Sequence, residues 1–300
     1  MRYLSQKLKK IIEADFKPPS QMHLEAFHHY YNVFGKAKKD IENILNKSIE
    51  DINVLVLGAG YRYGEVICWH NFCRNAVGIE ILENYYRDGF YKEFKTLAVS
   101  SNPLLAFFKA LNYRTFLPYY YEKLESLLGS KIVHPEYNLM KYDGESLPFE
   151  NNTFDLVISN AVTEHVRDMD QFLGESRRVL RKGGISYHVH HNYFSLSGAH
   201  MGMNLQKENP WGHLRSKFPP QSYCFSDGLN RLSKDQLLSS LIKNFPLGFM
   251  IGLDKNHNKF GTPEFEFEGE KYLSKNLAVD LNMFKEEDLL TRSFLLLGKK

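Results

Sequence analysis

Three glycines at the end of a short apolar run form the first group of residues that could bind a ligand. Gly58, Gly60 and Gly64 follow the run NVLVL, and Ala59 lies between the first two. Glycines at a strand-to-helix turn let the backbone approach a ligand closely and point helix N-terminal amides toward it. Glu80 follows about 20 residues later, where a carboxylate can accept hydrogen bonds from ribose hydroxyls. Because the spacing is GxGxxxG and not GxGxxG, a tight turn without a ligand remains an alternative.

Histidines form the second group. Four of the twelve lie close together in the chain: His188, His190, His191 and His200. Alternation along a strand places His188 and His190 on one face, and sends His191 to the other face at the strand end. An imidazole there could act as a general base, and His165 is a second candidate. The alternative for each of them is a structural role in packing and hydrogen bonding.

Neither group of possible metal ligands predicts a metal site. The HxHH run at 188–191 lacks an obvious partner carboxylate. Cys68, His70 and Cys73 would follow the glycine turn on a helix, where offsets of two and five residues scatter them around its circumference. We therefore predict that the protein binds no metal.

Aromatic residues make up 14% of the chain and concentrate in residues 83–134. Three consecutive rings, Tyr119, Tyr120 and Tyr121, cannot all face one core, so at least one should face a pocket or solvent. We predict an aromatic cover over the substrate site, joined from a second long segment by Trp211 and His213. Packing of the insertion against the body is the alternative, and it is the better expectation for any single ring.

Short apolar runs that alternate with helical stripes predict the elements that must position these residues. The predicted strands are 53–57, 75–81, 137–143, 154–160, 184–190, 247–253 and 293–298. Strands alternating with helices predict an α/β protein with a doubly wound parallel sheet. Its carboxyl edge, where ligands bind in such sheets, would hold the glycine turn, Glu80 and the end of the histidine run.

Helical and loop patterns outside the strands predict the domain organisation. Residues 1–50 form a mostly helical extension, whose second stripe includes Phe27, Tyr31, Phe34 and Ile41. Residues 51–300 form one domain. Two segments exceed a minimal crossover, and loops of that length are usually functional covers or disordered. We predict that 83–134 is an inserted cap and that 195–232 is a second covering loop.

A further motif runs from residue 143 to residue 184. Asp143 ends the third strand, followed by GESLPF, then FDLVISNAVTEHV and, after a helix, RRVLRKGG. From residue 53 to about 190 the chain resembles the class I S-adenosylmethionine-dependent methyltransferases. It resembles the subgroup in which the following motifs occur in order: an acidic residue, a short loop containing LPF, a strand that begins with FD, the motif EHV and the motif RVL-x-x-GG. The resemblance implies a mostly parallel, Rossmann-like, seven-stranded sheet and S-adenosyl-L-methionine as the cofactor.

The resemblance also implies roles for individual residues. Gly58, Ala59 and Gly60 would lie against the methionyl part of the cofactor, and Glu80 would hold the ribose. Asp143 and Gly144 would face the adenine, and Asn160 would lie near the reacting methyl group. The implied cofactor-binding set is Gly58, Ala59, Gly60, Gly64, Glu80, Ile81, Asp143, Gly144, Asn160 and Ala161. His191 or His165 would take a proton from the acceptor, if the acceptor must lose one.

Two positions depart from the family pattern. Val56 stands where an acid is usual, and Arg62 stands where the third glycine is usual. These departures make a non-catalytic ligand-binding module on the same fold a credible alternative. A nicotinamide-dependent oxidoreductase is another, since it shares the glycine turn and the ribose acid, but DGESLPF and EHV have no role in binding a dinucleotide.

Composition restricts the partners. The chain has 300 residues, 43% hydrophobic and 24% charged, which is ordinary for a globular protein. Its net charge of +3 is far below that of chains built to bind phosphate backbones, so we expect a small-molecule substrate and consider nucleic acid unlikely. No apolar run approaches the roughly 18 residues of a membrane span. Three cysteines and a start without a signal-peptide pattern predict a cytoplasmic location. The acceptor and the oligomeric state stay open.

Overall fold

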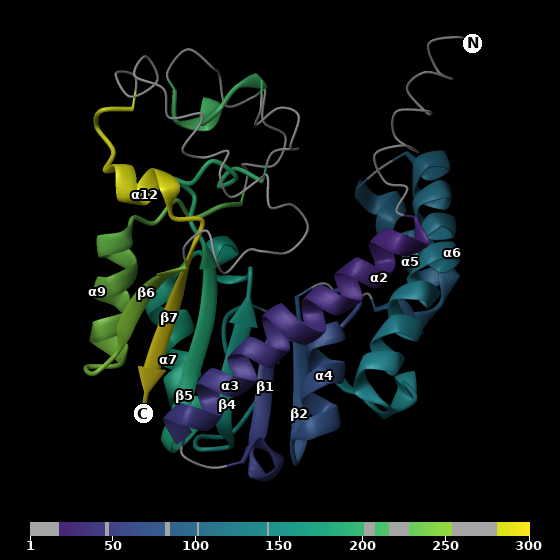
Figure 1. Ribbon diagram of the computed structural model, residues 1–300, viewed down its shortest axis with the longest axis horizontal. Coiled ribbons are helices and arrows are strands. Elements are labelled where there is room, and N and C mark those ends of the chain that lie inside the picture. The colour runs from purple at the N-terminus through teal and green to yellow at the C-terminus, as the bar shows by residue number, and fades with distance from the viewer. Residues whose placement is uncertain are drawn as a thin grey trace.

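Seven strands form one sheet in the order β3-β2-β1-β4-β5-β7-β6 (Figure 1). The computed structural model describes residues 18–45, 48–81, 85–100, 102–142, 144–200, 208–215, 228–253 and 281–300. The strands are β1 (Asn53–Leu57), β2 (Asn75–Glu80), β3 (Asn138–Lys141), β4 (Phe154–Asn160), β5 (Leu180–His191), β6 (Phe249–Leu253) and β7 (Ser293–Lys299). β1 to β5 pair in parallel, whereas β7 is antiparallel to both β5 and β6. The predicted doubly wound, mostly parallel α/β sheet is confirmed.

The strand order reverses at β1, which pairs with β2 on one side and with β4 on the other. In open α/β sheets, ligands bind in the crevice beyond the carboxyl ends of the strands at such a switch point. Gly58 follows β1, Ile81 follows β2 and Ala161 follows β4. The fold therefore brings most of the cofactor-binding residues implied by the resemblance to one edge.

Side-chain alternation along the strands separates two cores, one on each face of the sheet. Val54 and Val56 pack toward the N-terminal helices and α4 (Gly64–Phe72). Leu55 and Leu57 pack toward α7 (Met169–Val179) and α9 (Lys234–Asn244). The same alternation holds on β5, where Tyr187 belongs to the first core and the His188 ring lies against Phe172 of α7. The predicted division of the β5 side chains between the two faces is confirmed.

The N-terminal extension crosses the sheet as one long helical segment, purple in Figure 1. It consists of α2 (Pro19–His28), the π-helix η1 (His29–Phe34) and α3 (Gly35–Leu45), whereas residues 1–17 lie outside the described part. Phe34 and Ile41 are buried as predicted, but Phe27 and Tyr31 are 40% and 48% exposed. The prediction of one regular stripe was wrong, because a π-helical turn is wider than an α-helical turn and rotates the buried face.

The insertion at 83–134 is largely helical. Its main elements are α5 (Phe90–Ser100) and α6 (Pro103–Leu128), and α6 packs against both α5 and α2. Leu117, Tyr120, Tyr121 and Leu124 of α6 belong to the same apolar core as β1. The insertion is therefore anchored in the body of the protein through α6.

Short elements and small apolar clusters complete the fold. The short helices are η2 (Ile49–Asp51), η3 (Tyr86–Asp88), η4 (His134–Glu136), η5 (Thr163–His165), η6 (Gly212–Leu214) and α12 (Glu286–Leu290). Trp211, beside η6, is fully buried against Leu196, Leu281 and Leu289. This cluster connects the described part of the second long segment to α12 and not to α6.

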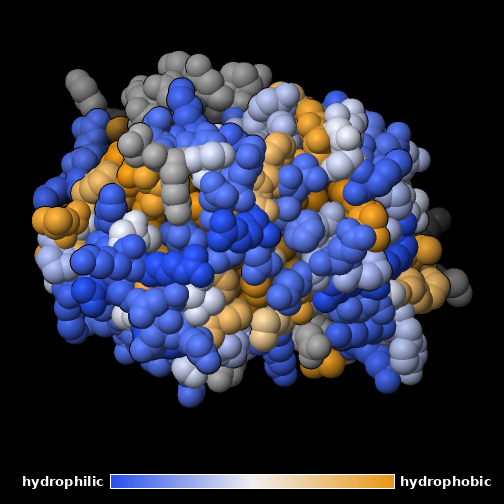
Figure 2. Space-filling view, turned by 90° about the horizontal axis from the view of Figure 1, so that it is seen from below, coloured by the Kyte–Doolittle hydropathy of each residue, from blue (hydrophilic) through white to orange (hydrophobic). Residues whose placement is uncertain are grey.

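The surface seen from below is mainly hydrophilic, with smaller hydrophobic areas between the polar groups (Figure 2). Phe249 and Ile251 on the edge strand β6 are among the exposed apolar residues. In the part of the chain that the structure describes, no helix has the length and apolar character needed to cross a membrane.

Candidate functional site

The glycine turn after β1 has a backbone that requires glycine. Gly58 has a φ of 74° and Gly60 a φ of 67°, both in the left-handed region that side chains disfavour. A Cβ atom on Gly58 would lie 2.2 Å from Cγ2 of Val162, whereas a Cβ atom on Gly60 would have no heavy atom within 4 Å. Gly58 is therefore required for packing against the segment after β4, and Gly60 faces open space that a ligand could fill.

Glu80 and the glycine turn are joined by hydrogen bonds. The Gly60 N–H donates to Glu80 Oε2 over 2.9 Å, and the Ile81 N–H donates to Oε1 over 2.8 Å. The N–H groups of Gly58 and Ala59 both donate to the carbonyl oxygen of Ile79. The carboxylate is thus held beside the open face of Gly60, where the resemblance implies the cofactor ribose.

The structure explains both departures from the family pattern. Arg62 forms an ion pair with Glu25 of α2, and its carbonyl oxygen accepts a hydrogen bond from Tyr121 Oη over 3.2 Å. Arg62 therefore connects the glycine turn to both α2 and α6. Val56 is fully buried in the middle of β1, where an ionised side chain would lose its hydration.

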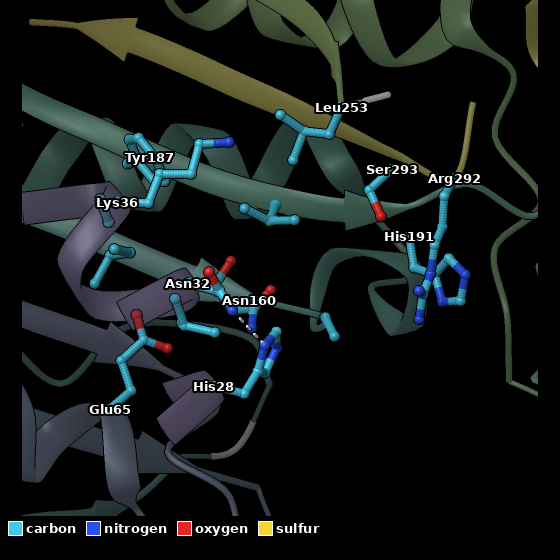
Figure 3. Close-up of a pocket in the computed structure, with 16 residues that line it drawn as sticks. His28, Asn32, Lys36, Glu65, Asn160, Tyr187, His191, Leu253, Arg292 and Ser293 are labelled. Atoms are coloured by element: carbon cyan, nitrogen blue, oxygen red, sulfur yellow. Dashed lines mark hydrogen bonds between the residues drawn. The ribbon is translucent and has the colours of Figure 1, made fainter. Parts of the chain in front are cut away.

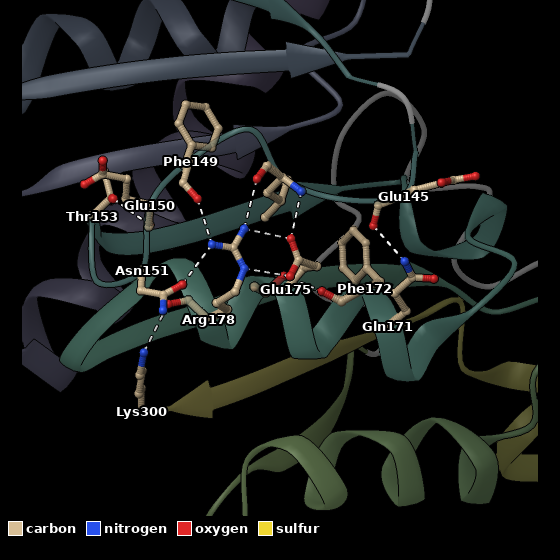
Figure 4. Close-up of polar contacts among 12 residues, drawn as sticks. Glu145, Phe149, Glu150, Asn151, Thr153, Gln171, Phe172, Glu175, Arg178 and Lys300 are labelled. Carbon is tan, nitrogen blue, oxygen red and sulfur yellow. Dashed lines mark hydrogen bonds and ion pairs between the residues drawn. The ribbon is translucent and has the colours of Figure 1, made fainter.

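The GESLPF loop is held by the helix that carries the RVL motif (Figure 4). Arg178 donates to the carbonyl oxygens of Phe149 and Leu147 over 2.7 and 2.9 Å. Glu175 accepts from the Leu147 N–H over 2.8 Å and also pairs with Arg178. Gly144, at the start of this loop, has a φ of 90°, and a Cβ atom there would lie 3.8 Å from Ile81 Cδ1. The two motifs thus fix the loop next to the end of β2, whereas Asp143 lies outside the described residues.

The end of β4 connects the glycine turn to a cavity. Asn160 and Ala161 line this cavity, and Ala161 has an unusual positive φ of 54°. The Ala161 N–H donates to the Val189 carbonyl oxygen over 3.1 Å, which continues the β4–β5 pairing. Val162 then turns back against Gly58. The implied methyl position and the cavity are therefore adjacent.

The cavity has a volume of about 210 Å³ and lies between the N-terminal helices and the sheet (Figure 3). His28, Asn32 and Lys36 line it from the helical extension. The remaining lining residues come from α4, from the strands and from the residue before β7: Glu65, Ile158, Ser159, Asn160, Ala161, Tyr187, Val189, His191, Leu253, Arg292 and Ser293, with Val33 and Ala37 of the extension. The described residues of the 83–134 insertion do not line it, so the wall predicted for the inserted cap is supplied by the extension.

Burial controls the protonation states around the cavity. It raises the pKa of Glu65 to about 7, and the neighbouring Trp69 side chain opposes that rise. Burial, together with the positive charge of Arg292, lowers the pKa of His28 below its ordinary value. Lys36 and Arg292 carry positive charge on the same walls. Neutral imidazoles, two cations and one weakly acidic carboxyl suit a polar or anionic small molecule.

His191 lies at the cavity end of β5, as predicted, and both of its ring nitrogens have partners. Nδ1 is 2.8 Å from His200 Nε2, and Nε2 is 2.9 Å from Ser197 Oγ. Burial and the nearby Arg292 hold the pKa of His191 well below its ordinary value. His165 lies in η5, outside the cavity lining, with its ring edge-on to His200 at 5.5 Å between centroids. Of the two predicted bases, only His191 borders the cavity.

The aromatic residues predicted to cover the substrate lie in two separate places. Tyr119 is 38% exposed, while Tyr120 and Tyr121 are buried between α6, α2 and α4. Trp211 is buried in the cluster near α12, and His213 Nε2 donates to the Tyr193 carbonyl oxygen over 2.8 Å. No described contact joins these two groups, and neither lines the cavity. Tyr120 and Tyr121 instead pack in the core, as the alternative to an aromatic cover predicted.

Part of the chain that forms this site is similar to a known protein family. Residues 120–187, which include β3, β4, α7 and most of β5, match a family model described as a methyltransferase domain. The chain carries a methyltransferase domain. The expected family is thereby confirmed over the region that holds the LPF loop, the EHV motif and the RVL motif.

Individual relatives of the methyltransferase domain cover only part of the chain. A tRNA (carboxymethyluridine(34)-5-O)-methyltransferase from Saccharomyces cerevisiae is 35% identical over 96 residues, 30% of this chain and 34% of that protein. A malonyl-[acyl-carrier protein] O-methyltransferase from Chlorobium luteolum is 39% identical over 66 residues, 21% of this chain and 25% of that protein. This chain therefore spans about a third or less of the length of each relative. A solved S-adenosylmethionine-dependent methyltransferase from Mesorhizobium loti covers 87% of this chain and 96% of its own, at 11% identity and a TM-score of 0.44.

Several residues at the site of the methyltransferase domain were missed by sequence reasoning. His28, Asn32 and Lys36 belong to the extension, whose helical pattern indicated packing and not a ligand wall. Glu65 and Arg292 are isolated charges in the sequence, and only the tertiary fold brings them to the cavity. Glu164 was different, because it stands in the EHV motif and could have been considered as a partner for the histidines.

Proposed function

We propose that this protein transfers a methyl group from S-adenosylmethionine to a small or medium-sized acceptor. The observation that carries the proposal is the junction of two features at one sheet edge. The glycine turn with Glu80 lies at the ends of β1 and β2, and a polar cavity begins at Asn160 and Ala161 at the end of β4. Gly58, through its contact with Val162, makes these two features continuous.

Each part of the junction has a proposed role. The open face of Gly60 and the carboxylate of Glu80 fit the methionyl and ribose parts of the cofactor, and Gly144 and Ile81 would border the adenine. The bound cofactor supplies an electrophilic methyl group. The protein then mainly holds the acceptor in line with that group, which converts a bimolecular reaction into an effectively unimolecular one. Asn160 would lie between the cofactor and the cavity.

A base is needed only for acceptors that must lose a proton. We assign that role to His191 because it borders the cavity and burial keeps its imidazole neutral near pH 7. The close contact with Ser197 at Nε2 means that the proton would move through the hydroxyl or require a small shift of the loop. His165 would support the same loop from η5.

The acceptor is proposed to be small because the cavity has a volume of only about 210 Å³. Both partial relatives are named O-methyltransferases, which supports an oxygen acceptor. One of them acts on a tRNA, so a nucleic acid is the competing class of acceptor. The net charge of +3 favours the small molecule, because extensive phosphate contacts would require a stronger basic surface.

We also propose a cytoplasmic location. In the described part of the chain, Cys68 is a buried free thiol and Cys73 a half-buried one. Free thiols persist in reducing compartments, where disulfides are rare.

Labelled cofactor provides the direct test. Purified protein and S-adenosylmethionine carrying a deuterated methyl group are incubated with a small-metabolite extract in one arm and with bulk tRNA in the other. The proposal expects the label in a small molecule, with loss of transfer in Glu80→Ala. Label found only in tRNA would overturn the small-acceptor assignment, and no transfer to either pool, despite cofactor binding, would favour the non-catalytic module.

A further inference from the structure

Two histidines and one glutamate meet beside the cavity. Glu164 belongs to η5, His191 ends β5, and His200 lies in the segment that follows β5. One nitrogen from each imidazole and one Glu164 carboxylate oxygen lie within 4.8 Å of one another. His191 Nδ1 is 2.8 Å from His200 Nε2, which in turn is 3.8 Å from Glu164 Oε1. The sequence offers no obvious partner carboxylate for the histidine run, but the fold brings Glu164 beside it.

Glu164 is buried without the partners that a carboxylate needs. The residue is 2% exposed, and among the described groups neither carboxylate oxygen has a hydrogen-bond partner. A buried carboxyl group is costly unless it is paired, hydrogen-bonded or coordinated to a metal. The Glu164 side chain therefore lacks the partner that a cation would supply.

The backbone around Glu164 is fixed by Asn230. The Asn230 N–H donates to the Glu164 carbonyl oxygen over 2.8 Å. Its side-chain amide donates to the carbonyl oxygens of Thr163 and Val166 over 2.7 and 2.9 Å. Glu164 therefore sits on a held turn, which limits the reorganisation needed to coordinate an ion.

His191 is oriented for metal ligation by a contact at its second ring nitrogen. His191 Nε2 is 2.9 Å from Ser197 Oγ, and ligating imidazoles commonly use their second nitrogen in such an orienting hydrogen bond. Arg292 and His165 also lie near the rings, and their positive charges would oppose a cation there.

We propose that Glu164, His191 and His200 bind a divalent transition metal of the Zn²⁺ type at the edge of the cavity. Two imidazoles and one carboxylate are the protein ligands of catalytic zinc sites and of non-haem iron sites, and both leave coordination positions open. Donor atoms on a tetrahedral zinc are about 3.3 Å apart, given bonds of about 2.0 to 2.1 Å. Small side-chain rotations from the present separations would reach that geometry.

The metal site is independent of methyl transfer, because a bound ion would be detectable whether or not the protein turns over. It competes, however, with the base role assigned to His191, because a neutral imidazole that coordinates through Nδ1 carries its proton on Nε2 and has no free nitrogen to accept another. His191 also borders the cavity, so an open position of the ion would face a bound acceptor. An acceptor oxygen bound there would lose its proton more easily, as water does on zinc.

The test uses the full chain, freed of metal with a chelator and titrated with Zn²⁺ in a calorimeter. We expect one Zn²⁺ per chain. Glu164→Gln and His200→Ala should each weaken binding by about 100-fold or more, because even outer-shell partners of a metal typically contribute 10- to 100-fold. Co²⁺ serves as a second probe, and its visible absorption should indicate nitrogen and oxygen ligation in the wild type and be lost in both variants.

His70→Ala is the matched control, because His70 is an exposed histidine on α4 and contacts Tyr137 away from the cluster. Its Zn²⁺ affinity should equal that of the wild type. The proposal is overturned if the wild type binds no stoichiometric Zn²⁺, or if both cluster variants bind it unchanged. Should Glu164→Gln fail to fold, His200→Ala decides, since the His200 side chain is 29% exposed and tolerates truncation better.

Discussion

Gly60 and Gly129 have nearly the same positive φ but lie in different parts of the fold, so substitutions at the two positions distinguish an effect on cofactor binding from an effect on stability. Their φ values are 67° and 70°, and a Cβ atom on either would have no heavy atom within 4 Å. Alanine should therefore cost each position about 1 to 2 kcal/mol of folding free energy through the left-handed backbone alone. Only Gly60→Ala should also weaken S-adenosylmethionine binding, because its methyl group would occupy the space proposed for the cofactor. Denaturant unfolding and calorimetry measure the two effects, and equal cofactor affinity in both variants would contradict the proposed placement.

A second prediction concerns the contribution of Glu80 to cofactor affinity. Glu80→Ala removes the acceptor of the Gly60 and Ile81 N–H groups as well as the proposed ribose contact. We expect at least about a 10-fold loss of cofactor affinity, as hydrogen bonds to charged groups contribute roughly 1.5 to 3 kcal/mol. Glu80→Gln retains one acceptor oxygen and should lose less. An alanine variant that is folded and binds the cofactor normally would remove Glu80 from the site.

The buried Glu65 side chain should make the stability of the protein depend on pH. Because burial raises the folded-state pKa to about 7, above the ordinary 4.5, the native state binds this proton more tightly than the unfolded state. The contribution of Glu65 to stability is therefore full below about pH 4.5 and is lost as the pH rises to about 7. Glu65→Gln should be more stable than the wild type at pH 8, by up to on the order of 3 kcal/mol, and similar at pH 4.5. Urea unfolding at the two pH values checks this, and a difference that does not change with pH would contradict it.

At the scale of elements, α6 is attached to the N-terminal helices by Tyr120. Its hydroxyl oxygen is 2.5 Å from His29 Nδ1, in a fully buried position against Gly64. Tyr120→Phe should destabilise the protein by about 0.5 to 1.5 kcal/mol, because the half-buried His29 imidazole loses its hydrogen-bond partner. Tyr119→Phe is the matched control, since that ring is partly exposed, and should have little effect. Equal unfolding midpoints for the two variants would show that this bond does not anchor α6.

The helices and strands could be predicted from sequence where they depend on residues close together in the chain. The β1 run NVLVL and the glycines after it gave the strand and the turn, because both depend on neighbouring residues. The π-helical turn at His29–Phe34 was not predictable from hydrophobic period, since the same residues fit an α-helix. Likewise, Arg292 reaches the cavity only because β7 inserts antiparallel beside β5. Residues of the site that depend on such tertiary pairing carry no local signal.

In the whole molecule, three parts of the chain meet at one edge of the sheet, where we propose that the ligands bind. The helical extension supplies one wall of the cavity, the β1–β2 turn the proposed cofactor site, and β5 with the residue before β7 the far wall. A ligand that binds only the native form raises the unfolding temperature, and the stabilisation grows with the logarithm of its concentration relative to Kd. Binding at this edge should therefore stabilise the whole protein and not only one loop.

Calorimetric titration of the full chain with S-adenosylhomocysteine and, separately, with NAD⁺ tests whether the sheet edge binds the cofactor of a methyltransferase. The demethylated product contains the methionyl, ribose and adenine groups proposed for the site, and it cannot be consumed during the measurement. We expect one site for S-adenosylhomocysteine, weakened in Glu80→Ala and in Gly60→Ala, and no binding of NAD⁺. Binding of NAD⁺ without binding of S-adenosylhomocysteine would rule out the proposed cofactor and favour a nicotinamide-dependent oxidoreductase.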